Sequence, residues 1–264
     1  MNEIYLEVAE LVKTNKGGVI CTIINSRGST PRHEGSKLLL FPDGHISGSV
    51  GGGEIENWVI REAKQAYMDG KTKLVSYDMV DTNKGDPGIC GGHVDVFIEP
   101  IMPHPRIVII GGGHVGRAVA HIARWLGFTV AVSDDRIEFC TIEVNPDAEE
   151  FYPVKMSEIP SHLEITSYTY LVLATRGMDV DVEGLPSLIS TNAAYIGIIG
   201  SKRRWEMTKK QLIKMGISKE TLSKVHSPIG LELQAESPEE IAISIMAEII
   251  MLRNGGSGKS MKTS

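Results

Sequence analysis

The residues best suited to chemistry lie between positions 107 and 136, where the chain reads IVIIGGGHVGRAVAHIARWLGFTVAVSDDR. Three glycines have the spacing of a dinucleotide-binding turn. Gly111 would make the turn, Gly113 would let the backbone approach a pyrophosphate, and Gly116 would let the next helix pack closely. That helix would begin near His114, where unpaired N–H groups and a partial positive charge favour phosphate. The stretch therefore predicts a nucleotide site.

Two side chains beyond the turn bear on which nucleotide would bind. Asp134 follows the expected strand 129–133 and is placed to accept hydrogen bonds from an adenosine ribose, which favours NAD. Arg136 keeps NADP open, because a guanidinium can pair with a 2′-phosphate. The alternative for the whole motif is a glycine turn that only packs the fold.

Two loops in the first hundred residues carry more polar and glycine residues than a simple scaffold needs. The first surrounds a proline-fixed turn with two guanidiniums and hydroxyls, a combination that can clamp a phosphate. The second leads three glycines into a helix start, a geometry that aims backbone N–H groups at an anion. Purely structural turns are the alternative. The residues concerned are Arg27, Ser29, Thr30 and Arg32 in the first loop, and Gly51, Gly52 and Gly53 in the second.

Cys90 is the candidate reactive residue of the chain. Gly91 and Gly92 follow it and would leave its sulfur uncrowded. A neighbouring Arg or His would favour the thiolate, whereas the alternative is an inert cysteine buried at a strand start. Cys21 lies in an apolar run and is expected in the core. Three widely spaced cysteines predict neither a disulfide framework nor a metal site made by the protein alone.

The pattern of apolar residues predicts two kinds of fold in one chain. After residue 107, buried strands at 107–110, 129–133, 170–174 and 195–199 alternate with helices, which predicts a Rossmann-like, doubly wound parallel sheet. Before it, helices at 4–12 and 54–68 flank strands at 19–24, 37–41, 74–77 and 94–98, with a hairpin at 37–49. The overall class is α/β, with an α+β domain first.

The proline-rich segment 99–105 marks the boundary, because it suits neither a helix nor a central strand. We expect an α+β domain at 1–100, a linker at 101–106, a Rossmann-like domain at 107–253 and a flexible tail at 254–264. Ser237, Pro238 and Glu240 form a good start for the last helix. That helix is apolar on more than one face, so it is either buried within the subunit or part of a homodimer contact.

Composition excludes several classes of function. The 264 residues are 42% hydrophobic and 23% charged, values typical of globular proteins, with a net charge of −6. That charge argues against general affinity for nucleic acid or an anionic membrane. No apolar stretch reaches membrane-span length, and the acidic, amphipathic N-terminus is unlike a signal peptide. We therefore expect a cytoplasmic protein without nucleic-acid or membrane partners.

The chain resembles the xanthine dehydrogenase accessory proteins, the XdhC/CoxI family, along nearly its whole length. The matching motifs are GSTPR at 28–32, GSVGGGEIE at 48–56, CGG at 90–92, IEP at 98–100, GGGHVGRA at 111–118, DDR at 134–136, YIGIIGSKRR at 195–204, PIGLEL at 228–233 and SPEEIAISIMAEII at 237–250. The chain departs from the family pattern where Gln234 replaces a frequent glycine and where 176–178 lacks a frequent histidine.

The resemblance implies a maturation factor that binds molybdenum cofactor and assists its sulfuration and insertion into a xanthine dehydrogenase-like enzyme. It also implies a cysteine desulfurase and the apo-molybdoenzyme as partners. Cys90 would either ligate molybdenum or relay sulfur. The residues at which the cofactor would lie are Arg27, Ser29, Thr30, Arg32, Gly51, Gly52, Gly53, Cys90, Gly91 and Gly92. The Rossmann half would hold NAD(P) or a nucleotide-bearing form of the cofactor. Two other classes stay open: an NAD(P)-dependent oxidoreductase, and a nucleotide or redox sensor.

Overall fold

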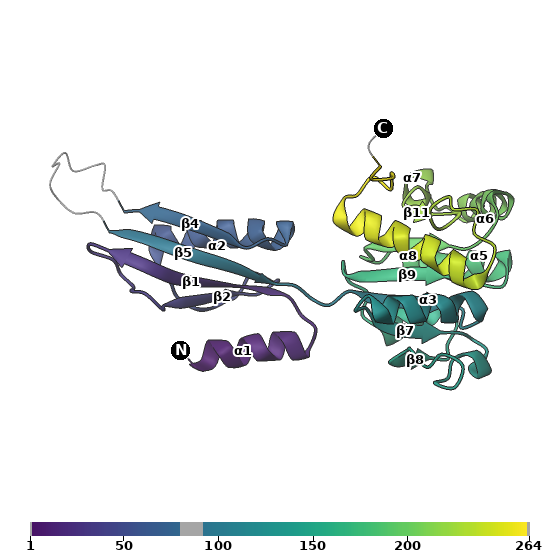
Figure 1. The fold of residues 1–264 in the computed structure, drawn as a ribbon, viewed down its shortest axis with the longest axis horizontal. Helices are drawn as coiled ribbons and strands as arrows, with labels where there is room; N and C mark the ends of the chain where they lie inside the picture. Colours follow the sequence, from purple (N-terminus) through teal and green to yellow (C-terminus); the bar gives the residue numbers. More distant parts are fainter. Residues whose placement is uncertain (1, 80–91, 263–264) are drawn as a thin grey trace. The chain divides into compact units, whose positions relative to one another are not determined.

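The computed structural model describes residues 2–79 and 92–262, so two residues singled out by the sequence, Cys90 and Gly91, lie outside the described residues. The chain divides into two compact units, residues 1–103 and residues 104–264. Figure 1 draws the first unit in purple and blue and the second in teal, green and yellow. Each unit has its own sheet and its own buried hydrophobic core.

The first unit is an antiparallel sheet in the order β3-β2-β1-β5-β4. Its elements are α1 (Asn2–Lys13), β1 (Gly18–Arg27), β2 (Lys37–Leu40), β3 (Ile46–Gly48), α2 (Gly53–Asp69), β4 (Lys73–Asp78) and β5 (His93–Ile101). Alternate strand residues point to opposite faces. Cys21 and Leu38 join the core with α2, whereas Ile20 and Leu39 pack with α1. The predicted α+β organisation, the hairpin at 37–49 and the burial of Cys21 are confirmed.

β5 continues through Pro100, a position that we expected to break the strand. Pro100 lies opposite Val19 of β1, and the strand ends at Ile101. β4 begins at Lys73, opposite Ile98, so β5 has a strand neighbour on one side only beyond that point. Proline is tolerated there because no second strand needs its missing N–H. The segment without helix or strand between β5 and the next strand, which begins at Arg106, is therefore 102–105.

The second unit is a parallel sheet in the order β11-β10-β9-β6-β7-β8. Its strands are β6 (Arg106–Ile110), β7 (Thr129–Ser133), β8 (Glu150–Tyr152), β9 (Thr169–Leu173), β10 (Tyr195–Ile198) and β11 (Val225–His226). Its helices are α3 (His114–Trp125), α4 (Ile159–His162), α5 (Met178–Ile189), α6 (Lys202–Lys214), α7 (Lys219–Leu222) and α8 (Pro238–Asn254), with short 3₁₀ turns at Ile137–Phe139 and Met156–Glu158.

Helices cover both faces of this parallel sheet. α3 and α8 pack on one face, and α4, α5 and α6 pack on the other. The chain runs outward from β6 through β7 to β8, then returns to β9 on the other side of β6. The predicted Rossmann-like, doubly wound fold is confirmed, and the order of its strands reverses between β6 and β9. Ligands of such folds usually bind outside the carboxyl ends of the strands at this reversal.

The last helix begins as the sequence predicts. The Ser237 hydroxyl accepts a hydrogen bond from the Glu240 N–H, and the Glu240 carboxylate accepts one from the Ser237 N–H. One face of the helix is buried within the unit through Ile245 and Met246. Just before it, Gln234 has φ +53°, the left-handed region that favours glycine. Gln234, where we expected a departure from the family pattern, thus has a backbone conformation that a glycine would adopt without strain.

Two glycines of the α3 turn should respond oppositely to alanine. A Cβ on Gly116 would lie 2.0 Å from the Gly111 carbonyl oxygen, whereas a Cβ on Gly113 would meet nothing within 4 Å. Gly116→Ala should therefore lower the free energy of unfolding by about 2–3 kcal/mol, the usual cost of overpacking. Gly113→Ala, the control, should change it by less than about 0.5 kcal/mol. Urea denaturation of both variants checks this, and equal losses would contradict the close contact.

Candidate functional site

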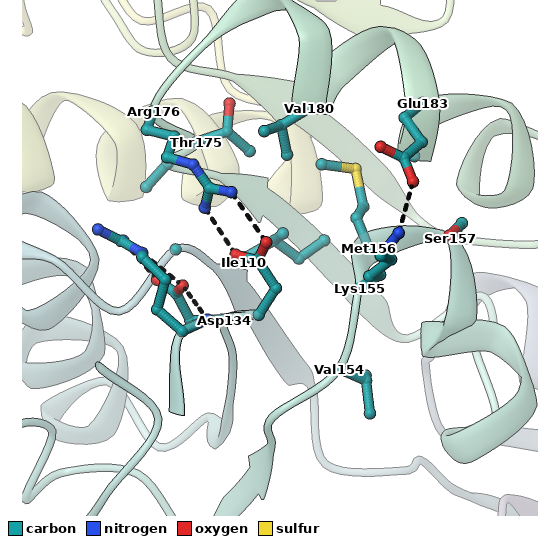
Figure 2. Close-up of a pocket in the computed structure, with 15 residues that line it drawn as sticks. Ile110, Asp134, Val154, Lys155, Met156, Ser157, Thr175, Arg176, Val180 and Glu183 are labelled. Atoms are coloured by element: carbon teal, nitrogen blue, oxygen red, sulfur yellow. Dashed lines mark hydrogen bonds and ion pairs between the residues drawn. The ribbon is translucent and has the colours of Figure 1, made fainter. Parts of the chain in front are cut away.

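A pocket opens at the carboxyl ends of the strands, where the strand order reverses. It has a volume of about 80 Å³. Figure 2 shows side chains entering it from the loops after β7, β8 and β9 and from α5. The lining residues are Ile110, Gly111, Asp134, Asp135, Arg136, Val154, Lys155, Met156, Ser157, Ala174, Thr175, Arg176, Val180, Glu183 and Gly184. The sequence predicted three of them, Gly111, Asp134 and Arg136.

Asp134 faces the glycine turn, with both carboxylate oxygens bonded inside the protein. Oδ2 accepts the Gly112 N–H at 3.0 Å and Nη2 of Arg136 at 2.8 Å. Oδ1 accepts the backbone N–H and the Nε of Arg136 at 3.0 and 2.9 Å. The side chain is only 2% exposed. Asp134 therefore does not present the free carboxylate that we expected to meet a ribose.

The glycine turn itself is tightly enclosed. Gly111 has φ +116°, and a Cβ there would lie 2.3 Å from the Ala174 carbonyl oxygen. Asn145 braces the turn, because its Nδ2 donates to the carbonyl oxygens of Gly112 and Phe139 at 3.2 and 2.8 Å. No hydrogen bond among the described residues uses the N–H of Gly113 or His114. Those two amides, at the start of α3, are the part of the predicted phosphate cradle that stays open.

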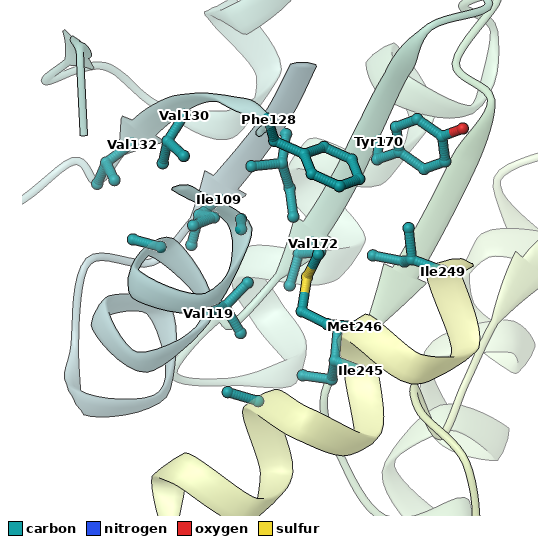
Figure 3. Close-up of a cluster of buried hydrophobic side chains, with 14 of the residues drawn as sticks. Ile109, Val119, Phe128, Val130, Val132, Tyr170, Val172, Ile245, Met246 and Ile249 are labelled. Carbon is teal, nitrogen blue, oxygen red and sulfur yellow. The ribbon is translucent and has the colours of Figure 1, made fainter. Parts of the chain in front are cut away.

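The core under α3 holds this turn in place. Figure 3 shows Val119 of α3 close to Met246 and Ile245 of α8, with Val172 of β9 beside them. Phe128, just before β7, and Tyr170 of β9 pack edge to face, with ring centroids 5.6 Å apart. All these side chains are buried, which fixes the position of α3 on the sheet.

An ion pair crosses the end of β6. Arg176, after β9, donates from Nη1 and Nη2 to the two carboxylate oxygens of Asp135, after β7, at 2.6 and 2.8 Å. β6 lies between β7 and β9 in the sheet, so this pair passes over its end. The hydrogen bonds from Arg176 lower the pKa of Asp135 to about 2. On the other side of the pocket, Lys155 pairs with Glu183 at 3.2 Å (Figure 2).

Arg204, at the end of the YIGIIGSKRR motif, makes its hydrogen bonds inside the protein. Its Nε and Nη2 donate to Asp181 Oδ2 at 3.0 and 2.6 Å, and its Nη1 and Nη2 donate to the carbonyl and hydroxyl oxygens of Thr175. Asp181 is almost fully buried, and this burial raises its pKa against the effect of Thr175 and Arg204. Arg204 thus fixes the loop that carries Arg176.

In the first unit, the structure brings parts of the predicted loops together. A Cβ on Gly51 would lie 2.8 Å from Cγ of Pro31, and one on Gly92 would lie 2.2 Å from the carbonyl oxygen of Ser29. The Thr30 hydroxyl is buried without a hydrogen-bond partner in the described part of the chain. Arg27 and Arg32 extend their side chains into solvent. The GSTPR loop therefore contacts both the glycine-helix loop and Gly92, the last residue of the CGG motif and the only one of its three that is described.

Two of the three glycine amides in the glycine-helix loop, those of Gly51 and Gly52, have acceptors within the protein and are not open to an anion as expected. Glu56 turns back from α2, and its Oε2 accepts the Ser49 hydroxyl at 2.6 Å. The same oxygen accepts the N–H groups of Val50 and Gly52, each at 3.3 Å. The Gly51 N–H donates to the Ser49 hydroxyl at 3.2 Å. A carboxylate of the protein thus occupies the anion position that the loop geometry creates.

A histidine that the sequence did not single out stands beside these loops. His93, which follows Gly92, hydrogen bonds through Nδ1 to Asp78 at 2.6 Å and through Nε2 to Asp95 at 3.2 Å. The bond to Asp78 raises the pKa of His93, against the lowering effect of burial. Asp95 also accepts hydrogen bonds from Asn25 and Ser76, and these lower its pKa. The sequence signal that could have found this group is Asp78 at the end of one expected strand, together with His93 and Asp95 at the start of another.

Comparison with known proteins identifies the class. A model of the XdhC Rossmann domain matches residues 107–249, and a model of the XdhC and CoxI family matches residues 11–78. The chain belongs to the XdhC and CoxI family. In the described part of the chain, no helix has the length and apolar character of a membrane span. Nor do the described residues gather three or more His, Cys, Asp or Glu side chains in a metal-binding arrangement.

Two bacterial proteins are similar to this chain at more than 30% identity. The chain is 36% identical to the uncharacterised protein YqeB of Escherichia coli K12, over 98% of the chain and 48% of YqeB. It is 35% identical to a Bacillus subtilis protein described as a probable xanthine dehydrogenase subunit, over 60% of the chain and 46% of that protein. The chain thus spans about half the length of these two relatives.

A third relative is the molybdenum cofactor insertion chaperone PaoD of Escherichia coli K12. It is 19% identical, over 92% of the chain and 86% of PaoD. A crystal structure described as a xanthine dehydrogenase from Bacillus halodurans has a TM-score of 0.52 and 23% identity, with 97% of each chain covered. That likeness supports the fold alone.

Removing the Glu56 carboxylate should loosen the first unit. Glu56→Ala leaves the Ser49 hydroxyl and two backbone amides without their acceptor, which should cost about 1–3 kcal/mol of unfolding free energy. Glu54→Ala is the matched control, because Glu54 lies in the same first helical turn with an exposed side chain. Chemical denaturation compares the two, and equal effects would show that Glu56 does not hold the loop.

The ion pair with Arg176 should determine the pKa of Asp135. In Arg176→Gln the pKa of Asp135 should rise from about 2 toward its ordinary value of 3.8, as measured by carboxyl NMR. Because the folded pKa is lowered, the pair stabilises the protein above pH about 4, and this contribution disappears as pH falls toward 2. The native protein and Arg176→Gln should therefore converge in stability at the acid end. An unchanged Asp135 titration would contradict the pairing.

Proposed function

We propose that this chain is an accessory factor that binds molybdenum cofactor and assists its sulfuration and insertion into a xanthine dehydrogenase-like enzyme. Membership of the XdhC and CoxI family supports the role. So do the names of two relatives, a molybdenum cofactor insertion chaperone and a probable xanthine dehydrogenase subunit. The observation that carries the proposal within the structure is the meeting of the three first-unit motifs at Pro31, Gly51, Ser29 and Gly92.

The chemistry of these loops suits a pterin phosphate that bears a metal dithiolene. Because Glu56 accepts the N–H groups of Val50 and Gly52, the groups that we assign to a phosphate are the exposed guanidiniums of Arg27 and Arg32 and the hydroxyl of Thr30, which has no hydrogen-bond partner among the described residues. A guanidinium fork matches two phosphate oxygens. The bound cofactor would supply the molybdenum and its terminal sulfur, and Cys90, by resemblance, would ligate the metal or relay sulfur.

His93 adds a proton-holding group to this proposal. It follows Gly92 directly and stands three positions after Cys90 in the sequence. Its two carboxylate partners favour the imidazolium, which would attract an anionic ligand and favour a nearby thiolate. The expected partners are a cysteine desulfurase, as the sulfur source, and the apo-molybdoenzyme, as the recipient.

A retention experiment tests the role. The purified full chain is incubated with molybdenum cofactor released from a molybdoenzyme, desalted, and assayed for bound pterin and molybdenum. We expect near-stoichiometric retention, a loss of about tenfold or more in affinity for Arg32→Ala because a charge-assisted hydrogen bond is removed, and a similar loss for Thr30→Val. Arg61→Ala, an exposed arginine of α2, is the control and should retain the cofactor.

The same preparation tests transfer and the alternative function. Loaded chain should activate an apo-molybdoenzyme of the xanthine dehydrogenase class, and Cys90→Ala should lower the fraction of sulfurated product. No retention by the folded native chain would contradict the proposal. Steady substrate-dependent oxidation of NADH without any partner would instead favour an oxidoreductase.

A further inference from the structure

Three cationic side chains reach the pocket of the second unit from three different strand ends. Arg136 follows β7, Lys155 follows β8 and Arg176 follows β9. Arg136 and Arg176 are near enough that the charge of Arg176 opposes the rise in the pKa of Arg136 that Asp134 causes. Arg136 is held flat over the Phe139 ring, 4.0 Å from its centroid. Like charges gathered in one place need anions between them, and in this structure Asp134 and Asp135 supply them.

The two aspartates differ in how firmly they are held. Asp134 is 2% exposed and accepts four hydrogen bonds from the protein, so it is part of the fold. Asp135 is 35% exposed, and its partner Arg176 is 47% exposed. An exposed pair of this kind contributes little to stability and is in contact with water. A stronger anion can therefore replace Asp135 on Arg176 at little cost.

We propose that this pocket binds a nucleotide that carries a phosphate monoester, and that Arg176 exchanges Asp135 for that phosphate when the nucleotide enters. The planar fork that grips the two oxygens of Asp135 has the geometry to grip two oxygens of a phosphate. No described hydrogen bond uses Nη1 of Arg136, which leaves a second guanidinium donor for the same group. The phosphate then lies between Arg136 and Arg176.

The rest of the pocket fits the remainder of a nucleotide. Val154, Met156 and Val180 give it apolar walls on which a base can pack. The amides of Gly113 and His114 do not line this pocket, but they stand at the start of α3, where the fold places a phosphate chain. With the ion pair closed, the pocket has a volume of about 80 Å³, and both Arg176 and Asp135 line it. Exchange of partners by Arg176 would therefore change the shape of the site.

This assignment reverses the preference that the Asp134 motif suggested. A ribose diol needs a free carboxylate, and Asp134 has none to offer. A 2′-phosphate needs guanidinium groups, and two are present. The proposal concerns the second unit alone and does not rest on the proposed function, so either can fail without the other.

Calorimetric titration of the full chain with NADP⁺ and NAD⁺ tests the proposal, because the two differ by one phosphate monoester. We expect NADP⁺ to bind about tenfold or more tightly than NAD⁺, the effect of one or two charge-assisted hydrogen bonds. Arg176→Gln should remove that difference and leave NAD⁺ binding unchanged. Arg203→Gln, an exposed arginine of α6 outside the pocket, is the matched control and should keep the difference.

The Asp135→Asn variant distinguishes an ion pair that opens to bind phosphate from one that is only structural. If Asp135 holds the place of the phosphate, its neutral isostere should bind NADP⁺ several-fold more tightly than the native chain. Weaker NADP⁺ binding by Asp135→Asn would overturn the exchange. Equal binding of NADP⁺ and NAD⁺ by the native chain, binding of neither, or displacement of NADP⁺ by an equal concentration of inorganic phosphate would overturn the nucleotide assignment.

Discussion

The Asp134 carboxylate is the interaction on which the second unit's site depends. It ties the turn after β6 to the end of β7 by accepting the Gly112 N–H, and it fixes Arg136 through both its backbone and its guanidinium. Because the group is buried, loss of the carboxylate would leave a buried amide and a guanidinium unpaired, at a cost well above that of a surface ion pair. The closure of the glycine turn onto β7 and the position of Arg136 both depend on this one side chain.

In the first unit, too, a carboxylate of the protein accepts hydrogen bonds from the amides of a glycine-containing turn. Its glycine loop also forms an anion position, and Glu56 fills it from the first turn of α2. In both units a carboxylate of the protein closes a main-chain turn, and exposed guanidiniums lie nearby. Anionic ligands would therefore be recognised mainly by arginine side chains presented on rigid turns. Arginine side chains held on rigid turns would thus provide the anion recognition that the proposed maturation role requires.

Sequence patterns were sufficient for the longer elements, missed the short strands β8 and β11, and were insufficient for the partners of polar side chains. The β-branched run at 107–110, the glycine spacing and the Ser237 cap are local signals, and local geometry satisfies them. The bonding of Asp134, Glu56 and Arg204 depends on which elements the fold brings within hydrogen-bond distance, and no local pattern encodes that. Pro100 was misjudged for the same reason, since its place in β5 depends on where β4 begins. Cys90 and Gly91, the centre of one predicted motif, lie outside the described residues.

Hydrogen exchange at a single amide tests the central claim most directly. If the Asp134 carboxylate holds the glycine turn, the Gly112 N–H should exchange slowly in the native protein. In Asp134→Ala it should exchange at least about tenfold faster, the equivalent of about 1.4 kcal/mol, relative to the Ile109 amide in the middle of β6. Fast exchange at Gly112 in the native chain, or equal acceleration at Gly112 and Ile109 in the variant, would contradict the account.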